Sequence, residues 1–139
     1  MKDKSNKQLL SLTYKIGEVQ KDLLTISSYS DTFVKIESKR YNLPLCIIGN
    51  NIFQWNDKNY LNLNLEIVKN LFDDSNRSVV DRIEVIIIGL SSGKINNLID
   101  LKNKSMDTKL PLEIMKHDAA CRTINILSME GRKILAIII

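Results

Sequence analysis

Short runs of β-branched and aromatic residues, separated by polar breaks, occupy the first part of the chain. Three such runs lie at residues 23–28, 32–37 and 41–48. A further short run at 52–55 ends at Asn56-Asp57, a dipeptide that favours a turn. Runs of this length between polar breaks are typical of strands. We therefore expect antiparallel strands in this region.

The apolar positions adopt a helical spacing after residue 60. They fall on one face of a helix, at Leu61, Leu65, Val68, Leu71 and Phe72. An asparagine at residue 62 is available to cap the start of this helix, and the polar residues 73–76 end it. The pattern predicts a helix between these limits.

The next segments alternate between strand and helix patterns. Residues 83–89 are apolar and mostly β-branched, as expected of a central strand covered on both faces. A second helix is indicated by Ile95, Leu98, Ile99 and Leu101, and a second buried strand by residues 111–115. A strand, a helix and a strand in this order predict a parallel, right-handed crossover.

A third helix is predicted after residue 117. We expect Asp118 to cap it, Ala120, Ile124 and Leu127 to share its buried face, and Gly131 to occupy the left-handed position after its end. The apolar run 134–138 is then expected to close the sheet.

These elements predict a single α/β domain over residues 21–139, preceded by a partly ordered arm at 1–20. The expected architecture has three layers, with a central mixed sheet, helices packed on it and an additional antiparallel region near the N-terminus. At 139 residues and 44% hydrophobic composition, the chain can bury one core without disulfides or metals.

Composition narrows the function classes. The two cysteines, Cys46 and Cys121, have no paired spacing and the chain has one histidine, so we predict neither a disulfide nor a metal site, and no cofactor. The net charge of +4 does not imply a nucleic-acid partner. No apolar run approaches the roughly 18 residues of a membrane helix, and the first residues lack a signal-peptide pattern. We expect a cytoplasmic protein.

One stretch carries a family resemblance. The pattern Ala-Ala-Cys-Arg-Thr-x-Asn at 119–125 lies between a strand ending at Met115 and a strand that follows Gly131-Arg132. It resembles the small α/β domain family of largely unknown function that includes assembly factor 3 of mitochondrial respiratory complex I and an animal protein named for adipogenesis. The likeness extends upstream through the Gly-x-Ser-x-Gly segment at 89–93, Trp55 and the turn at 29–33, and covers roughly residues 24–139.

The resemblance implies a non-enzymatic protein-interaction domain that assists the assembly of respiratory complex I. Its expected partners are complex I subunits or assembly factors. In a bacterium this implies a peripheral position at the inner membrane. The family usually has Asp-Thr-Gly where this chain has Lys116-His117-Asp118, and Asp where this chain has Asn56.

The segment from Gly89 to Gly93 invites two enzymatic interpretations. A phosphate-binding P-loop needs four residues between its glycines and a hydroxyl residue after the lysine, but this chain has three residues there, and Ile95 follows the lysine. A nucleophile elbow would place Ser91 at the turn and need a histidine base, for which only His117 is available. The simpler interpretation is a tight turn between strand and helix.

The start of the third helix offers another candidate site. Its amides could hold an anion with help from Arg122, although an Asp118 cap would compete. The alternative function is therefore a small-molecule or anion-binding protein, or an enzyme, that uses the segment 89–93 and residues 118–122. Cys121 is a weak candidate for a reactive thiol, with a small buried hydrophobe as its alternative.

The remaining candidates are polar or aromatic. Arg122, Thr123 and Asn125 are expected either to fasten the helix to the Gly89 segment or to contact a partner. Trp55 is either an exposed interaction anchor or buried against the first helix.

Overall fold

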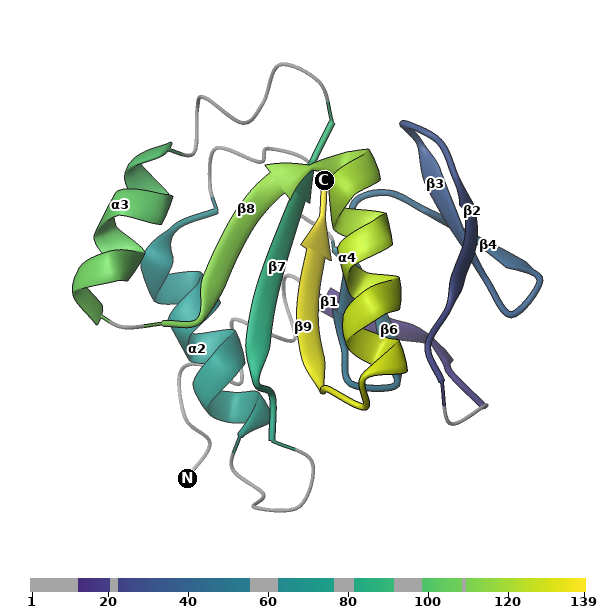
Figure 1. Ribbon diagram of the computed structural model, residues 1–139, viewed down its shortest axis with the longest axis horizontal. Coiled ribbons are helices and arrows are strands. Elements are labelled where there is room, and N and C mark those ends of the chain that lie inside the picture. The colour runs from purple at the N-terminus through teal and green to yellow at the C-terminus, as the bar shows by residue number, and fades with distance from the viewer. Residues whose placement is uncertain (1–12, 21–22, 56–62, 77–81, 92–98, 109) are drawn as a thin grey trace.

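The computed structural model describes residues 13–20, 23–55, 63–76, 82–91, 99–108 and 110–139. These residues form nine strands and three helices (Figure 1). Six strands make one mixed sheet, and three make a small antiparallel sheet. The α/β fold with a mixed sheet and helices packed on it is therefore confirmed.

The larger sheet combines an antiparallel half and a parallel half. Its spatial order is β1 (Thr13–Glu18), β6 (Asn51–Trp55), β5 (Leu45–Ile48), β9 (Ile134–Ile138), β7 (Val85–Leu90) and β8 (Leu112–Lys116). β7 pairs with β8 and β9 in parallel, and the other pairs are antiparallel. The parallel pairing expected for the strand–helix–strand segment is thus correct.

Two predicted strand positions are wrong. β7, predicted as the central strand, lies one place from the edge, and β9, predicted to close the sheet, lies in its interior between β5 and β7. A run of apolar residues reports that both faces are covered, but it does not identify the neighbouring strands. Residues 13–18 belong to the predicted N-terminal arm, and the structure shows them as the edge strand β1.

The smaller sheet consists of β2 (Ile26–Tyr29), β3 (Phe33–Ile36) and β4 (Lys39–Asn42). Glu37 and Ser38, which join β3 to β4, both have positive φ, as a two-residue hairpin turn of type I′ requires. The run 41–48, predicted as one strand, is divided between the two sheets. Pro44 lies between β4 and β5, where it has no N–H to contribute to a ladder.

Strand alternation creates one core on each face of the larger sheet. In β5, Leu45 and Ile47 belong to one core and Cys46 to the other. The first core lies under the smaller sheet and α4 (His117–Met129). The second lies under α2 (Leu65–Ser75) and α3 (Ile99–Thr108). The result is the predicted three-layer arrangement (Figure 1).

Local signals explain where two of the helices begin or end. Asn64 caps α2, and its Oδ1 accepts a hydrogen bond from the Ile67 amide at 3.0 Å. Gly131 follows α4 with a φ of 76°, and the Arg132 amide donates to the Leu127 carbonyl at 3.0 Å. This is the predicted glycine-terminated helix end. No helix among the described residues is long and apolar enough to cross a membrane.

Candidate functional site

A pocket lies where the parallel strands β7 and β8 end and α4 begins. Ligands of open α/β sheets commonly bind at this position, beyond the carboxyl ends of the strands. The pocket has a volume of about 450 Å³ and includes the turn that follows β2. Its lining residues are Tyr29, Ser30, Asp31, Leu90, Lys116, His117 and Asp118.

His117 is the buried polar group of this pocket. The residue is 5% exposed, and neither ring nitrogen has a hydrogen-bond partner within the described part of the chain. The Tyr29 ring packs against it edge to face, with centroids 5.6 Å apart and planes at 83°. An unsatisfied buried polar group typically costs about 1–3 kcal/mol of stability. A group kept at such a cost is a candidate for ligand binding.

Asp118 lies in the first turn of α4 and is not its N-cap, contrary to the sequence-based expectation. The N-cap is Lys116, whose side chain makes no capping bond, because β8 runs directly into α4. Asp118 Oδ1 instead accepts from the Ala119 amide at 2.9 Å. That hydrogen bond, and then the charge of Arg122, hold the pKa of Asp118 below its usual value. The carboxylate thus occupies part of the space that a bound anion would use.

Arg122 connects α4 to Tyr29, the last residue of β2. Its Nη1 lies 3.5 Å from Asp118 Oδ2, and its side chain also forms a hydrogen bond with Tyr29. The Tyr29 hydrogen bond is the main reason that the pKa of Arg122 is raised further. These contacts connect α4 to β2, and not to the Gly89 segment as one of the two sequence-based expectations for Arg122 had it. The Arg122 side chain remains largely exposed.

Asn125 fastens α4 to the smaller sheet. Its Nδ2 donates to the Ile26 carbonyl at 3.0 Å, and its Oδ1 accepts from the Ile26 amide at 2.7 Å. Both main-chain groups of one β2 residue are therefore bound by one side chain. The fastening role considered for Asn125 is correct in kind, but it connects to β2 and not to Gly89. Thr123 is half-buried on the same helix.

Gly89 belongs to β7 and is needed for close packing. A Cβ atom at this position would lie 2.7 Å from the Ala120 Cβ of α4. Ser91, just after β7, donates from its amide to the Ile139 main-chain oxygen at 3.1 Å, and its Oγ lies 3.4 Å from the same oxygen. Ser91 does not line the pocket of His117. Gly93 lies outside the described residues.

Cys121 has the opposite environment to that of a reactive thiol. It is fully buried, and burial, followed by the nearby Asp118 charge, raises its pKa to about 12. Burial likewise raises the pKa of Cys46 to about 12. A thiolate nucleophile needs a lowered pKa. The alternative interpretation, that both cysteines act as small hydrophobes, agrees with the structure.

Trp55 cannot be an exposed interaction anchor. It is 3% exposed at the end of β6 and belongs to the core that also contains Val68 and Leu71 of α2. Burial against the first helix, the alternative given by the sequence, is therefore correct. Among the described residues, no group of three or more His, Cys, Asp or Glu side chains could hold a metal ion.

A family described as a protein of unknown function (DUF498/DUF598) matches residues 26–139. The chain belongs to this family. No curated protein matches the sequence. The matched residues include the motif at 119–125 and the residues that line the pocket, and the family's description gives no activity.

Solved structures from three bacteria share the fold of this DUF498/DUF598 member. A Bordetella parapertussis protein has a TM-score of 0.62 at 17% identity, over 86% of this chain and 98% of that one. A Bordetella pertussis Mth938-like domain has a TM-score of 0.60 at 16% identity, over 89% and 90% of the two chains. A Bartonella henselae protein described as an outer membrane protein has a TM-score of 0.58 at 20% identity, over 84% and 93%.

The sequence pointed to the start of α4 as a candidate site, but not to the turn after β2 that also lines the pocket. From the sequence, His117 was a candidate only as a catalytic base, for Ser91 or for Cys121, and Tyr29, Asp31 and Lys116 were not candidate site residues. Lys116 and His117 lie side by side in a short polar stretch, so the sequence pattern does not show that His117 is buried while Lys116 is exposed. The turn at 29–33, noted as part of the family resemblance, was the available clue that this segment meets α4.

Proposed function

We propose that this protein acts through protein contacts and assists the assembly of respiratory complex I, the NADH:quinone oxidoreductase. It is a non-enzymatic domain in this proposal, and it binds unassembled complex I subunits or assembly factors. The structural observation that supports contact with a protein is the outer face of α4. There Ile126 is 58% exposed and Met129 is 74% exposed.

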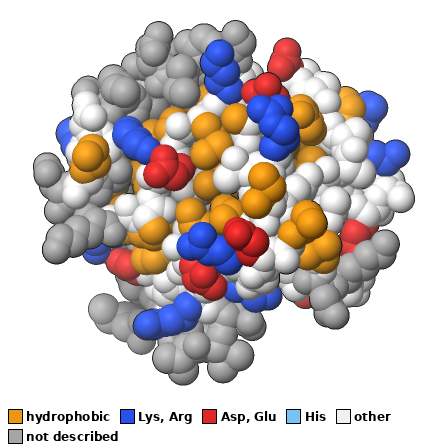
Figure 2. Space-filling model, in the orientation of Figure 1, with side chains coloured by type: hydrophobic (Ala, Val, Ile, Leu, Met, Phe, Trp, Pro, Cys, Tyr) orange, Lys and Arg blue, Asp and Glu red, His pale blue; other side chains and the backbone are white. Residues whose placement is uncertain are grey.

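These two residues share a helix face with Arg122. Positions 122, 126 and 129 follow one another at intervals of four and three, which places them in one row along α4. Aromatic residues, methionine and arginine are enriched in protein interfaces. Figure 2 shows hydrophobic side chains interspersed with charged ones on the face of the molecule that carries α4. We name the row formed by Arg122, Ile126 and Met129 the α4 outer row.

The partner in this proposal comes from the family resemblance. The motif at 119–125, on which the resemblance to complex I assembly factor 3 rests, lies on the same helix as the α4 outer row. Two apolar side chains cover much less than the roughly 800 Å² per partner of a stable interface, so the contact also involves neighbouring elements. The proposed location is the cytoplasmic side of the inner membrane, with peripheral attachment through complex I.

The proposal is tested in cells that lack the gene. We expect less assembled NADH:quinone oxidoreductase on native gels while its subunits are still synthesised, as measured by mass spectrometry. Wild-type protein should restore the complex, and the double variant Ile126→Lys/Met129→Lys should not. The matched control is Met106→Lys on α3, because Met106 is 70% exposed outside the α4 outer row. Normal complex levels in the deletion strain would refute the proposal.

A second candidate function is small-molecule binding at the pocket of His117. The observation that favours it is the buried imidazole, which has no hydrogen-bond partner in the described segments. The version that relies on an anion at the α4 amides is weakened, because the Asp118 carboxylate accepts from one of them. A thermal-shift screen in which neither anions nor metabolites stabilise the protein would count against this candidate.

A further inference from the structure

We propose that the pocket of His117 binds a small zwitterion that carries an ammonium group and a carboxylate, of the class of free α-amino acids. This inference rests on the second candidate function, small-molecule binding, and names its ligand class. The lining residues leave hydrogen-bonding and charged groups unused, and these groups complement such a ligand.

His117 is the buried polar residue among those that line the pocket. A neutral imidazole has one donor nitrogen and one acceptor nitrogen, and neither has a partner among the residues that the structure describes. A ligand that both donates and accepts hydrogen bonds would satisfy this side chain. The adjoining Leu90 is apolar and buried, and the Tyr29 ring forms a second largely apolar wall. One polar contact point between apolar walls is the usual design of a small-molecule site.

The rim contributes two opposite charges from different elements. Asp31 lies in the turn between β2 and β3, and Lys116 is the last residue of β8. Both side chains are exposed, and neither is engaged in an ion pair or side-chain hydrogen bond among the described residues. An ammonium group on a ligand could therefore meet Asp31 while its carboxylate meets Lys116.

The other polar lining groups are already engaged. Ser30 Oγ forms a hydrogen bond with Thr32 Oγ1 at 3.2 Å, and Asp118 is bound by the Ala119 amide and Arg122. A simple anion is disfavoured because Asp31 and Asp118 both line the pocket. A simple cation would leave Lys116 without a counter-charge. Among the described lining residues, the unused groups are thus one carboxylate, one ammonium and one imidazole, which together complement a zwitterion.

The volume agrees with a ligand of this size. Small-molecule pockets in proteins are about 300–1,000 Å³. The pocket of His117, at about 450 Å³, lies near the small end of that range. A free amino acid could place its charged end between Asp31 and Lys116 and its side chain against the Tyr29 ring.

The test is a titration of the ¹⁵N-labelled full chain followed by heteronuclear NMR. The probes are the free L-amino acids, the corresponding amino alcohols, which lack the carboxylate, and the N-acetyl amino acids, which lack the ammonium. Inorganic phosphate is the fourth probe. At least one amino acid should shift the amide resonances of Ser30, Asp31, Lys116 and His117, with a Kd at least tenfold lower than that of either of its analogues.

Variants assign the two charges. Asp31→Asn should weaken binding of the amino acid about tenfold and leave binding of the N-acetyl analogue, which lacks the ammonium, unchanged. Lys116→Gln should also weaken binding of the amino acid about tenfold, but leave binding of the amino alcohol, which lacks the carboxylate, unchanged. His117→Phe should abolish binding of every probe while keeping a folded spectrum. Lys35→Gln, an exposed charge on β3 outside the pocket, is the matched control. Asp31 and Lys116 are exposed, so their variants keep the test valid if His117→Phe fails to fold.

The outcomes separate the two proposals. If phosphate or the N-acetyl compounds bind the pocket as tightly as the amino acids do, the zwitterion inference is wrong and small-molecule binding stands. If no probe shifts the pocket resonances at millimolar concentration, the zwitterion inference is wrong, and the thermal-shift screen decides whether small-molecule binding stands. If amino acids bind but Asp31→Asn and Lys116→Gln leave the affinity unchanged, the inference is also overturned, because the site then lies elsewhere.

Discussion

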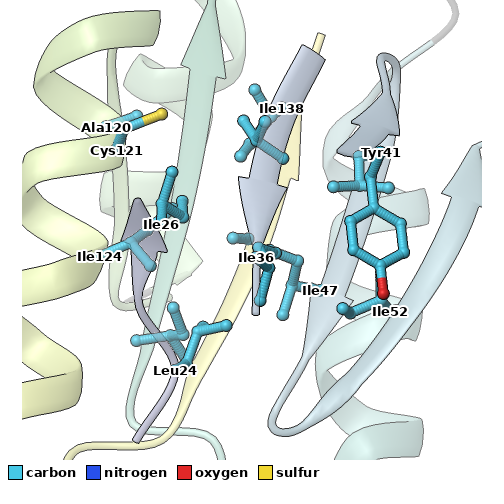
Figure 3. Packing of buried hydrophobic residues seen from close by; sticks show 14 of the residues in the cluster. Leu24, Ile26, Ile36, Tyr41, Ile47, Ile52, Ala120, Cys121, Ile124 and Ile138 are labelled. Atoms are coloured by element: carbon cyan, nitrogen blue, oxygen red, sulfur yellow. The ribbon is translucent and has the colours of Figure 1, made fainter. Parts of the chain in front are cut away.

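The inner and outer faces of α4 differ in what their residues contact. On the inner face, Ala120, Cys121 and Ile124 are fully buried, and they project towards the strands (Figure 3). On the outer face, Arg122 and Met129 are exposed to solvent. Ala120, Cys121 and Asn125 of the motif at 119–125 thus have mainly structural roles. A motif of this kind identifies the fold, and function has to be sought on the outer face or at the pocket.

The inner face tolerates few substitutions because it contacts both sheets. Ala120 contacts β7 of the larger sheet at Gly89, and Asn125 binds β2 of the smaller sheet at Ile26. A helix held at two places by short-range contacts has little freedom to adjust to a larger or less polar side chain. Substitutions on the inner face should therefore lower stability, whereas those on the outer face should leave it unchanged.

The largest effect is expected from Asn125→Ala. The substitution leaves the amide and the carbonyl of Ile26 without their side-chain partner, so the free energy of unfolding should fall by about 2–4 kcal/mol. Urea denaturation followed by circular dichroism measures the loss. Asn42→Ala on β4 is the control, because Asn42 is exposed and should cost less than about 0.5 kcal/mol. Equal losses in the two variants would show that Asn125 does not fasten the helix.

A smaller effect is expected from Gly89→Ala. The added Cβ would overlap the Ala120 Cβ, so we expect a loss of about 1–3 kcal/mol from overpacking. The compensating change Ala120→Gly costs about 1 kcal/mol alone through lower helix propensity. The double variant should be more stable than the sum of the single losses predicts, by about 1 kcal/mol or more. Additive losses would mean that the two positions are not in contact.

The elements were largely predictable from the sequence, but their neighbours were not. The β-branched runs and the helical spacing after residue 60 located most strands and α2, because these patterns report local geometry and burial. β7 and β9 are both apolar runs, so nothing in either shows that β9 occupies the interior of the sheet. β1 contains several polar residues, and its place depends on pairing with β6.

The site was less predictable than the fold for a related reason. Asp118 was expected to be the N-cap of α4. However, β8 ends at Lys116 and α4 begins at His117, so the N-cap position falls on Lys116. The burial of His117 depends on Tyr29, which is distant in the chain and reaches it only after β2 packs on α4. Pairwise contacts between distant segments leave no periodic signal in one sequence.

The stability that Cys121 contributes on the inner face of α4 should depend on pH. Burial raises the pKa of Cys121 from 9.0 to about 12, so the folded state holds its proton more tightly than the unfolded state does. Its contribution to stability is complete below pH 9.0 and is lost as the pH rises from 9.0 towards about 12. Between pH 8 and pH 10 the wild type should lose about 1 kcal/mol more than Cys121→Ala does. Urea denaturation under reducing conditions at both pH values measures this, and parallel losses would contradict it.

The smallest effect is expected on the outer face, from Arg122→Gln. The side chain is largely exposed and its ion pair with Asp118 spans 3.5 Å, so solvent screening leaves little stabilisation to lose. The melting temperature should equal that of the wild type within error. Recovery of complex I subunits in an affinity pull-down should nevertheless fall, because Arg122 belongs to the α4 outer row. If Arg122→Gln unfolds the protein as Asn125→Ala does, the contrast between the two faces of α4 is wrong, since the exposed arginine would then be part of the architecture.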